Sequence, residues 1–280
     1  MNTHCNKCPL SKFQSIRKKN ILYSFRAELR ETVSADFPEI VFKTSPIGTV
    51  TGRKKHNIVE INGRKFVIRH YEHGGLLRSF TRDVYPSPQR FMNEMFLSSY
   101  ALSNGIPTPE ISALRVTRTL FGYKADLVTF YIENSVDLQT LLQNKLSDIG
   151  LPRKKELIYK CACIVRKMHD AGIIHNDLHI KNILLSRNYQ ELKLFILDLD
   201  GAEISKELNE SIRLKNLFRL GRSLDKLENT NIITEKDKYT FFLKYLKSGN
   251  PLSINRYKAV YQFSKHRKLH SFWRYLLRKR

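Results

Sequence analysis

Three oxygen-bearing side chains between Ile174 and Gly201 have the types and spacing for chemistry on a phosphate. Asp177 lies in the segment HNDLHIKN, Asn182 follows five residues later, and Asp198 ends the apolar run LKLFIL. A hydroxyl that attacks a phosphate needs a carboxylate to orient it and accept its proton, whereas Mg²⁺ needs oxygen ligands that bridge it to the phosphates. We therefore predict that Asp177 is the catalytic base and that Asn182 and Asp198 bind magnesium. The alternative is that these residues only cap loops.

The spacing resembles the protein-kinase catalytic loop, HRDLxxxN, followed by the metal-binding DFG turn, which here read HNDLHIKN and DLDG. This resemblance implies an α+β, bilobal, protein-kinase-like fold that uses ATP and Mg²⁺. Such a fold has a small β-rich N-lobe with one helix and a mainly helical C-lobe. It also implies that His175 is structural rather than a base. Asn176 replaces the Arg of many protein kinases and no Ala-Pro-Glu follows, so control by activation-loop phosphorylation is not expected.

The same resemblance suggests which residues bind ATP. The third strand of the small lobe normally supplies a Lys to the α- and β-phosphates, paired with a Glu from the helix. FVIRHY places Arg69 there, and RFMNEMF offers Glu94. Arg can clamp a phosphate with two hydrogen bonds, although Arg69 could also be an ordinary surface arginine of a basic protein. Lys181, or else His179, would touch the transferred phosphate.

The chain before residue 134 is expected to supply five strands and one helix in the order β-β-β-α-β-β. The expected strands cover residues 39–44, 56–61, 64–71, 111–118 and 123–132, and the helix covers 90–103. Asn62-Gly63 between the second and third strands favours a hairpin. In place of a full glycine-rich loop there are only Gly48 and Gly52. Upstream, the pattern suggests a helix from Ile21 to Leu29.

The chain beyond residue 134 is expected to be mainly helical, with a hinge between the two lobes near residues 132–135. The expected helices cover residues 138–143, 154–171, 210–227, 235–247 and 253–278. The whole chain then divides into a basic N-terminal extension (1–35), a kinase N-lobe (36–133), a kinase C-lobe (134–250) and a basic amphipathic C-terminal segment (251–280).

The composition indicates a globular protein with an anionic partner. Forty-nine Lys and Arg against 26 Asp and Glu give a formal charge of +23, which attracts polyanions such as nucleic acid, anionic lipid or a phosphorylated glycan. The sequence has no membrane-spanning apolar run and no secretory signal, so a cytoplasmic location is expected. The cysteines lie in two close pairs and are expected to be free thiols. Cys5 and Cys8 lack two further ligands for zinc, so we expect a mobile tail there.

Longer stretches resemble the lipopolysaccharide kinases (Kdo/heptose kinases), over about residues 45–230 and most closely the kinases of 3-deoxy-D-manno-octulosonic acid (Kdo). The matching segments are RHYEHGG (69–75), GIPTPE (105–110), KADLVTF (124–130), HNDLHIKNILL (175–185), LDLDGAE (197–203) and NLFRLGRSLDK (216–226). Departures from the pattern are His179 in place of Asn, Phe130 in place of an acidic residue, and LDLDGAE in place of IDFDRG. They bear on the acceptor sugar more than on the reaction.

This resemblance implies that the γ-phosphate of ATP is transferred to position 4 of Kdo on a Kdo-lipid A precursor. The enzyme would lie peripherally at the cytoplasmic face of the bacterial inner membrane, on its anionic surface, and no nucleic-acid partner is expected. Residues 70–82 or the basic tail 265–280 could touch the membrane, although the tail also fits a core helix. A heptose kinase or a protein Ser/Thr kinase remains an alternative. An alternative of another class is a non-catalytic basic adaptor that binds membrane or nucleic acid.

Overall fold

The computed structural model describes residues 9–51, 55–73, 83–144, 150–188, 191–227 and 233–246. They divide into two compact units. Unit 1 contains the described residues up to Ser135 together with Ser186–Asn188 and Phe195–Glu203, and unit 2 contains the others. The expectations for Cys5, Cys8, residues 74–82 and the segment 251–280 fall outside the described residues.

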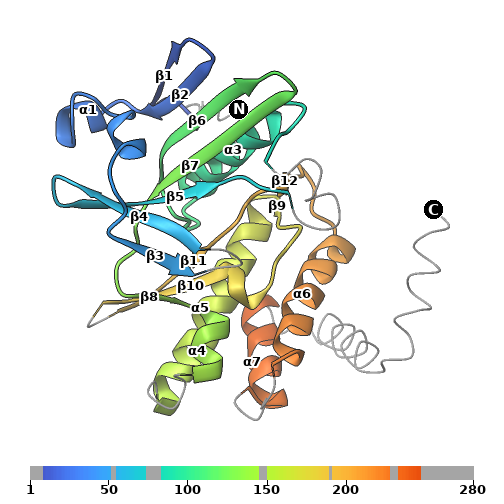
Figure 1. The fold of residues 1–280 in the computed structure, drawn as a ribbon. Helices are drawn as coiled ribbons and strands as arrows, with labels where there is room; N and C mark the ends of the chain where they lie inside the picture. Colours follow the sequence, from blue (N-terminus) through green and yellow to red (C-terminus); the bar gives the residue numbers. More distant parts are fainter. Residues whose placement is uncertain are drawn as a thin grey trace, which may run out of the picture. The chain divides into compact units, whose positions relative to one another are not determined.

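Unit 1 is built on a seven-stranded antiparallel sheet with the order β1-β2-β6-β7-β5-β4-β3 (Figure 1). Its strands are β1 (Phe13–Lys18), β2 (Ile21–Arg26), β3 (Gly48–Thr51), β4 (Lys55–Ile61), β5 (Arg64–His70), β6 (Ile111–Thr119) and β7 (Gly122–Phe130). Helix α3 (Gln89–Ser103) lies between β5 and β6 in the chain. The order β-β-β-α-β-β is therefore confirmed from β3 onward, and β1 and β2 extend the same sheet.

Two predictions for the first 45 residues are wrong. The pattern from Ile21 to Leu29 suggests a helix, but β2 occupies Ile21–Arg26 and pairs with β1 on one side and β6 on the other. Partners on both sides of this strand override the local helical pattern. Residues 39–44 are not a strand either, because Ile40–Phe42 forms a 3₁₀ helix, η1, whose Val41 is fully buried against the sheet. The strand that pairs with β4 begins later, at Gly48.

The sheet has a hydrophobic core on each face because side chains alternate along every strand. The short helix α1 (Leu29–Thr32) and η1 cover one face, whose core includes Phe25, Leu29, Val41, Phe66, Ala113 and Val128. Helix α3 covers the other face, whose core includes Tyr71, Phe91, Met95, Leu114, Ala125 and Leu127. In β5 the alternation places Arg69 on the α3 face, and His70 on the opposite one.

Local signals fix the ends of α3 and of the β4–β5 hairpin. Helix α3 stops at Gly105, whose φ of +67° is left-handed, and the N–H of Ile106 bonds back to the Ala101 carbonyl at 2.9 Å. In the predicted hairpin turn, Asn62 and Gly63 have φ values of 49° and 75°, as a type I′ turn requires. This turn sets the register of β5 and therefore the face that Arg69 occupies.

Unit 2 is mainly helical, as expected. Its helices are α4 (Leu138–Asn144), α5 (Gly150–Asp170), α6 (Glu210–Asp225) and α7 (Glu235–Leu246). The other elements of the described chain are β8 (Ser135–Asp137), β9 (Ile173–Ile174), η3 (Ile180–Asn182), β10 (Ile183–Asn188), β11 (Glu191–Ile196) and β12 (Glu203–Ile204). A hydrogen bond of 2.7 Å joins His169 of α5 to the Tyr245 hydroxyl of α7, and burial lowers the pKa of His169 to about 4. None of the helices in the described ranges is long and apolar enough to cross a bilayer.

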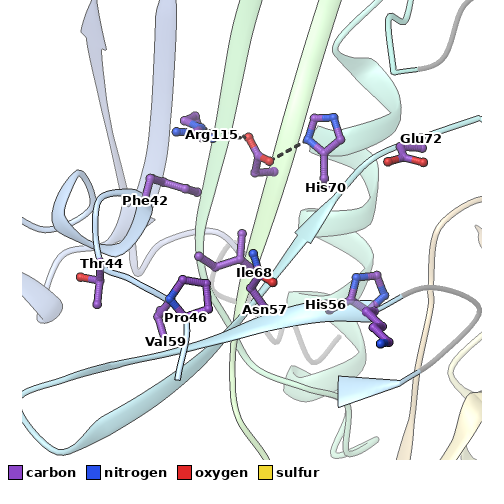
Figure 2. Close-up of a pocket in the computed structure, with 12 residues that line it drawn as sticks. Phe42, Thr44, Pro46, His56, Asn57, Val59, Ile68, His70, Glu72 and Arg115 are labelled. Carbon is purple, nitrogen blue, oxygen red and sulfur yellow. Dashed lines mark hydrogen bonds and ion pairs between the residues drawn. The ribbon is translucent and has the colours of Figure 1, made fainter. Parts of the chain in front are cut away.

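A polar pocket of about 330 Å³ opens on the sheet face opposite α3 (Figure 2). Within it, Asp126 of β7 accepts hydrogen bonds from Arg115 Nε of β6 at 2.9 Å and pairs with His70 Nδ1 of β5 at 2.7 Å. The Arg115 guanidinium also lies 3.9 Å from the centre of the Phe42 ring. These charges satisfy one another, so we interpret the pocket wall as a brace across three strands.

His70 is held between two carboxylates. Its Nε2 lies 3.0 Å from Asp83, which also pairs with Lys124 at 2.9 Å. The hydrogen bond with Asp126 raises the pKa of His70 against the opposing effect of burial, and Asp83 adds to the rise. The pocket is also lined by Lys55, His56 and Glu72. The network therefore favours the protonated imidazolium of His70.

We expect the stability of unit 1 to depend on this proton. The folded pKa lies above the unfolded value of about 6.5, so the stabilisation is complete below about pH 6.5 and is lost as the pH rises through the folded pKa. His70→Gln should lower the free energy of unfolding by about 1–3 kcal/mol at pH 6 and by clearly less at pH 9. Urea unfolding of both proteins at the two pH values measures this difference. An equal loss at both pH values would mean that the His70 proton does not contribute.

Candidate active site

The segment from His175 to Asn182 presents the predicted base, Asp177, in unit 2. Leu178 and Ile180 are buried, with 0% and 2% exposure, whereas the Asp177 side chain is 45% exposed. Alternate apolar residues thus anchor the backbone in the core of unit 2 and leave the carboxylate accessible.

Hydrogen bonds inside this loop bring Asp177 and Asn182 together. Asn182 Nδ2 donates to the Asp177 carbonyl at 2.9 Å, and the Asn182 backbone N–H donates to the His179 carbonyl at 2.8 Å. A carbonyl oxygen only accepts, so the first bond fixes the orientation of the amide. Oδ1 is consequently the atom that Asn182 can offer to a cation.

The neighbouring histidines and lysine differ in position. His175 is 1% exposed, and its Nδ1 accepts the Asp177 backbone N–H at 3.2 Å, which supports a structural role. His179 Nε2 lies 3.3 Å from Asp177 Oδ2, so this imidazole touches the predicted base. Lys181 lies exposed on η3.

One polar face of α6 holds the loop in place. Asn216, Arg219 and Ser223 are three and four residues apart and therefore share a helix face. They bind, in that order, the backbone N–H of His175, the carbonyl of Asn176 and the N–H of Ile180. This explains the physical role of the segment NLFRLGRSLDK, to which the sequence analysis assigned no task. The sequence feature that could have revealed this role is the helical spacing of the three polar side chains.

In unit 1, Arg69 joins the predicted partner Glu94 and the predicted metal ligand Asp198. Arg69 NH2 donates to both Glu94 oxygens at 2.5 Å, and Arg69 NH1 donates to Asp198 Oδ1 at 3.0 Å. The side chains of Glu94, Arg69 and Asp198 are 4%, 23% and 37% exposed, respectively. The cluster thus runs from the buried face of α3 toward solvent.

Tyr71 is a further member of this cluster that sequence reasoning missed. Its hydroxyl donates to Glu94 Oε2 at 2.5 Å, and the Arg69 guanidinium lies 4.7 Å from the centre of its ring. Burial raises the pKa of the Glu94 carboxyl, and the charge of Arg69 opposes that rise. For Arg69, burial lowers the pKa, but the carboxylates of Glu94 and Asp198 outweigh it and hold the pKa well above its usual value. Arg69 is therefore a fixed cation.

A second ion pair ties α3 to the segment that follows Asp198. Arg90 binds Asp200 through two hydrogen bonds, Nε to Oδ1 at 2.7 Å and NH2 to Oδ2 at 2.6 Å. Since Arg90 and Glu94 are one helical turn apart, a single face of α3 fixes both β5 and the Asp198–Asp200 turn. Sequence reasoning missed this pair as well, although LDLDGAE contains the second aspartate.

The backbone at Asp198 is unusual. Its φ of 57° lies in the left-handed region, which a non-glycine residue occupies at a cost unless its surroundings hold it there. Aspartate is among the residues that tolerate this region. The hydrogen bond from Arg69 to Oδ1 helps to hold Asp198 in this turn. Backbone strain that is held by the surrounding structure is typical of functional sites.

The predicted site residues thus fall into two sets. Arg69, Glu94 and Asp198 are brought together in unit 1, whereas Asp177, Asn182 and Lys181 lie in unit 2. Within the described ranges, no group of three or more His, Cys, Asp or Glu residues could hold a metal by itself. Gly48 begins β3, and Gly52 falls outside the described residues.

The fold can be compared with those of known proteins. In structure, the chain resembles WaaP, solved in complex with acyl carrier protein, with a TM-score of 0.61, 20% identity and coverage of 89% of this chain and 98% of that one. This likeness, at low identity, supports a kinase-like α+β fold.

Sequence comparison adds relatives at higher identity. The 3-deoxy-D-manno-octulosonic acid kinase of Vibrio cholerae is 33% identical over 184 residues, which cover 64% of this chain and 74% of that protein. The kinase of the same name from Vibrio parahaemolyticus is 30% identical over 220 residues, with coverage of 76% and 88%. Residues 43–245 match the description of the lipopolysaccharide kinase (Kdo/WaaP) family. Because this match covers most of the chain and both clusters, the protein belongs to the lipopolysaccharide kinase (Kdo/WaaP) family.

Proposed function

We propose that this protein is a 3-deoxy-D-manno-octulosonic acid kinase of lipopolysaccharide core biosynthesis. It transfers the γ-phosphate of ATP to the hydroxyl at position 4 of Kdo on a Kdo-lipid A precursor. The observation that carries the proposal is the Arg69–Glu94–Asp198 cluster, since the three residues that the kinase resemblance assigns to ATP and its metal bind one another. Relatives that share 30–33% identity bear the name of this activity.

On the ATP side, Arg69 is the residue that binds the phosphates. Glu94 and Tyr71 hold its guanidinium from the buried side, so the side chain is oriented before ATP arrives. Phosphate oxygens accept hydrogen bonds from a guanidinium strongly and with defined geometry. Lys181 is exposed and supplies a second positive charge for the transferred phosphate.

On the acceptor side, Asp177 orients the sugar hydroxyl and takes its proton. The hydroxyl oxygen forms the new bond to the γ-phosphorus while the bond from that phosphorus to the β–γ bridging oxygen breaks, and ADP leaves. The Asp177 side chain is 45% exposed, and its backbone N–H and carbonyl are held by the side chains of His175 and Asn182. Its carboxylate can therefore meet a bulky glycolipid without loss of position.

Asn182 and Asp198 are the residues that would hold Mg²⁺. Both offer oxygen, the ligand type that this ion prefers, and the Asn182 amide is already oriented with Oδ1 available for that role. When bound, the ion neutralises the phosphate charge and positions the γ-phosphate.

We further propose that residues 36–133 are the kinase N-lobe and residues 134–250 the C-lobe, with the hinge near residues 132–135. Unit 1 then combines the N-lobe with the C-lobe segment that carries Asp198. Strands β1 and β2, from the first 35 residues, then extend the N-lobe sheet. The acceptor places the reaction at the cytoplasmic face of the inner membrane, whose anionic surface attracts a chain with a charge of +23.

Removal of the base tests the reaction. Asp177→Asn keeps the size of the side chain but cannot accept the proton, so kcat should fall by about 10²–10⁴-fold while ATP still binds. Purified protein, ATP, Mg²⁺ and Kdo-lipid A precursor provide the assay, with mass spectrometry of the lipid to locate the new phosphate. Asp225→Asn, at an aspartate that pairs with Lys238 on the surface, is the matched control. Full activity in Asp177→Asn would refute the assigned role, and phosphate on a heptose would reassign the acceptor.

A double-substitution experiment separates the structural and binding roles of Arg69. Arg69→Met leaves Glu94 buried without its partner and should cost about 3–5 kcal/mol of unfolding free energy. Adding Glu94→Gln should recover part of that stability because the uncompensated charge is gone, but ATP binding should stay lost. Urea unfolding and ATP titration measure the two effects, and Arg153→Met at an exposed site of α5 is the control. Recovery of ATP binding in the double variant would contradict the phosphate-binding role.

The metal assignment predicts a shifted magnesium requirement. EDTA should abolish turnover and added Mg²⁺ should restore it. Asp198→Asn loses a charged ligand and should raise the Mg²⁺ concentration for half-maximal activity at least about tenfold. Asp36→Asn, at an exposed aspartate of unit 1, should leave that concentration unchanged. Turnover in EDTA without added metal would disprove the assignment.

A further inference from the structure

The turn between β6 and β7 exposes two large apolar side chains. The strands pair up to the residues on either side of it, so Leu120 and Phe121 are the two loop residues, and they are 89% and 86% exposed. Two-residue hairpin turns usually carry Asn, Asp or Gly. Lys19-Asn20 and Asn62-Gly63, in two other turns of the same sheet, follow this preference for polar or glycine residues. The folding of the sheet therefore does not require an apolar tip.

The hairpin is braced almost to its end. The Arg118 N–H donates to the Asn20 carbonyl at 2.8 Å, and Asn20 Nδ2 donates back to the Arg118 carbonyl at 2.9 Å. On the other side, Tyr123 and Tyr85 exchange both backbone hydrogen bonds, each at 2.8 Å. A Cβ at Gly122 would lie 2.3 Å from the Tyr85 carbonyl oxygen, so glycine permits this close approach. These bonds hold the two apolar side chains out in solvent.

Basic residues surround this tip. They are Arg118 and Lys124 on the hairpin itself and Lys18 and Lys19 at the adjacent β1–β2 turn. Glu39 pairs with Lys18, and Asp83 pairs with Lys124. The positive charges thus outnumber the carboxylates beside the tip, in line with the charge of the whole chain.

We propose that the β6–β7 tip inserts into an anionic lipid bilayer. Leu120 and Phe121 enter the boundary of the acyl layer, and the basic residues lie among the head-group phosphates. A bilayer fits better than a protein partner, because a stable protein interface buries about 800 Å² on each side and two side chains provide only a small part of that. The inference rests on the proposed function in one respect, namely that the acceptor is a membrane lipid. The tip is a different membrane contact from residues 70–82 and the tail 265–280, which the sequence suggested.

Vesicle binding of the full chain tests this contact without ATP or acceptor, so its outcome does not depend on the kinase reaction. The probe is phosphatidylethanolamine vesicles with phosphatidylglycerol, in about 0.15 M salt to screen long-range attraction. The variant Leu120→Ser/Phe121→Ser should bind at least about tenfold more weakly. Tyr159→Ser/Tyr239→Ser, at two exposed aromatic residues of α5 and α7, is the matched control and should bind like the wild type. Urea unfolding of the tip variant should match that of the wild type, which shows that the variant is folded.

A fluorescent reporter at the tip distinguishes insertion from surface attraction. The chain has one tryptophan, Trp273, so Phe121→Trp combined with Trp273→Phe leaves the reporter at the tip alone. Its emission should shift to shorter wavelength with anionic vesicles and stay unshifted with polyglutamate. An unshifted emission with vesicles, or vesicle binding of the serine variant equal to the wild type, would overturn the proposal. Loss of polyglutamate binding with vesicle binding retained would assign the tip to an acidic protein instead, and would overturn it too.

Discussion

The Arg69–Glu94 ion pair is the interaction on which the cluster of candidate site residues in unit 1 depends. A carboxylate that is 4% exposed carries a large desolvation cost unless it is paired and hydrogen-bonded. Arg69 and the Tyr71 hydroxyl meet that requirement. They reach Glu94 only if the register of β5 places them on the α3 face of the sheet and the rotation of α3 turns Glu94 toward that face. The pair therefore makes correct placement of strand and helix a condition for burying the charge, and it holds the guanidinium in one orientation, as its proposed phosphate-binding role requires.

Unit 2 also positions its candidate site residue through hydrogen bonds, most of them from neutral side chains. The loop around Asp177 is held through its backbone, by Asn182 from within and by Asn216 and Ser223 from α6. Buried polar groups must be satisfied, so these bonds specify one conformation of the loop. In both units, buried side chains carry the positioning, and the groups assigned to chemistry, Asp177 and Asp198, remain partly exposed. The residues that fix the geometry of the site are thus different from the residues that remain accessible to solvent.

A feature could be predicted from the sequence when neighbouring residues determine it, and not when residues distant in the chain determine it. The Asn62-Gly63 turn and the end of α3 at Gly105 are specified by their own residues, and both are as expected. Strand β2 and η1 are decided by the sheet that they pack on, so local pattern misassigned them. Arg69 and Glu94 were assigned through resemblance, because a strand arginine and a helix glutamate carry no local mark of their pairing. Tyr71 and the polar face of α6 were missed since their partners lie far along the chain.

The presence of arginine rather than lysine at position 69 follows from the number of groups around it. Glu94 and Asp198 approach the guanidinium at different nitrogens. A lysine ammonium is a compact point charge, whereas a guanidinium has five N–H donors in a fixed fork. Arginine can therefore satisfy the buried glutamate and reach the aspartate together, and further N–H donors are left for the proposed contact with phosphate. Under the proposed function, Glu94 would keep the guanidinium in place if a phosphate of ATP replaced Asp198 as its second anionic partner.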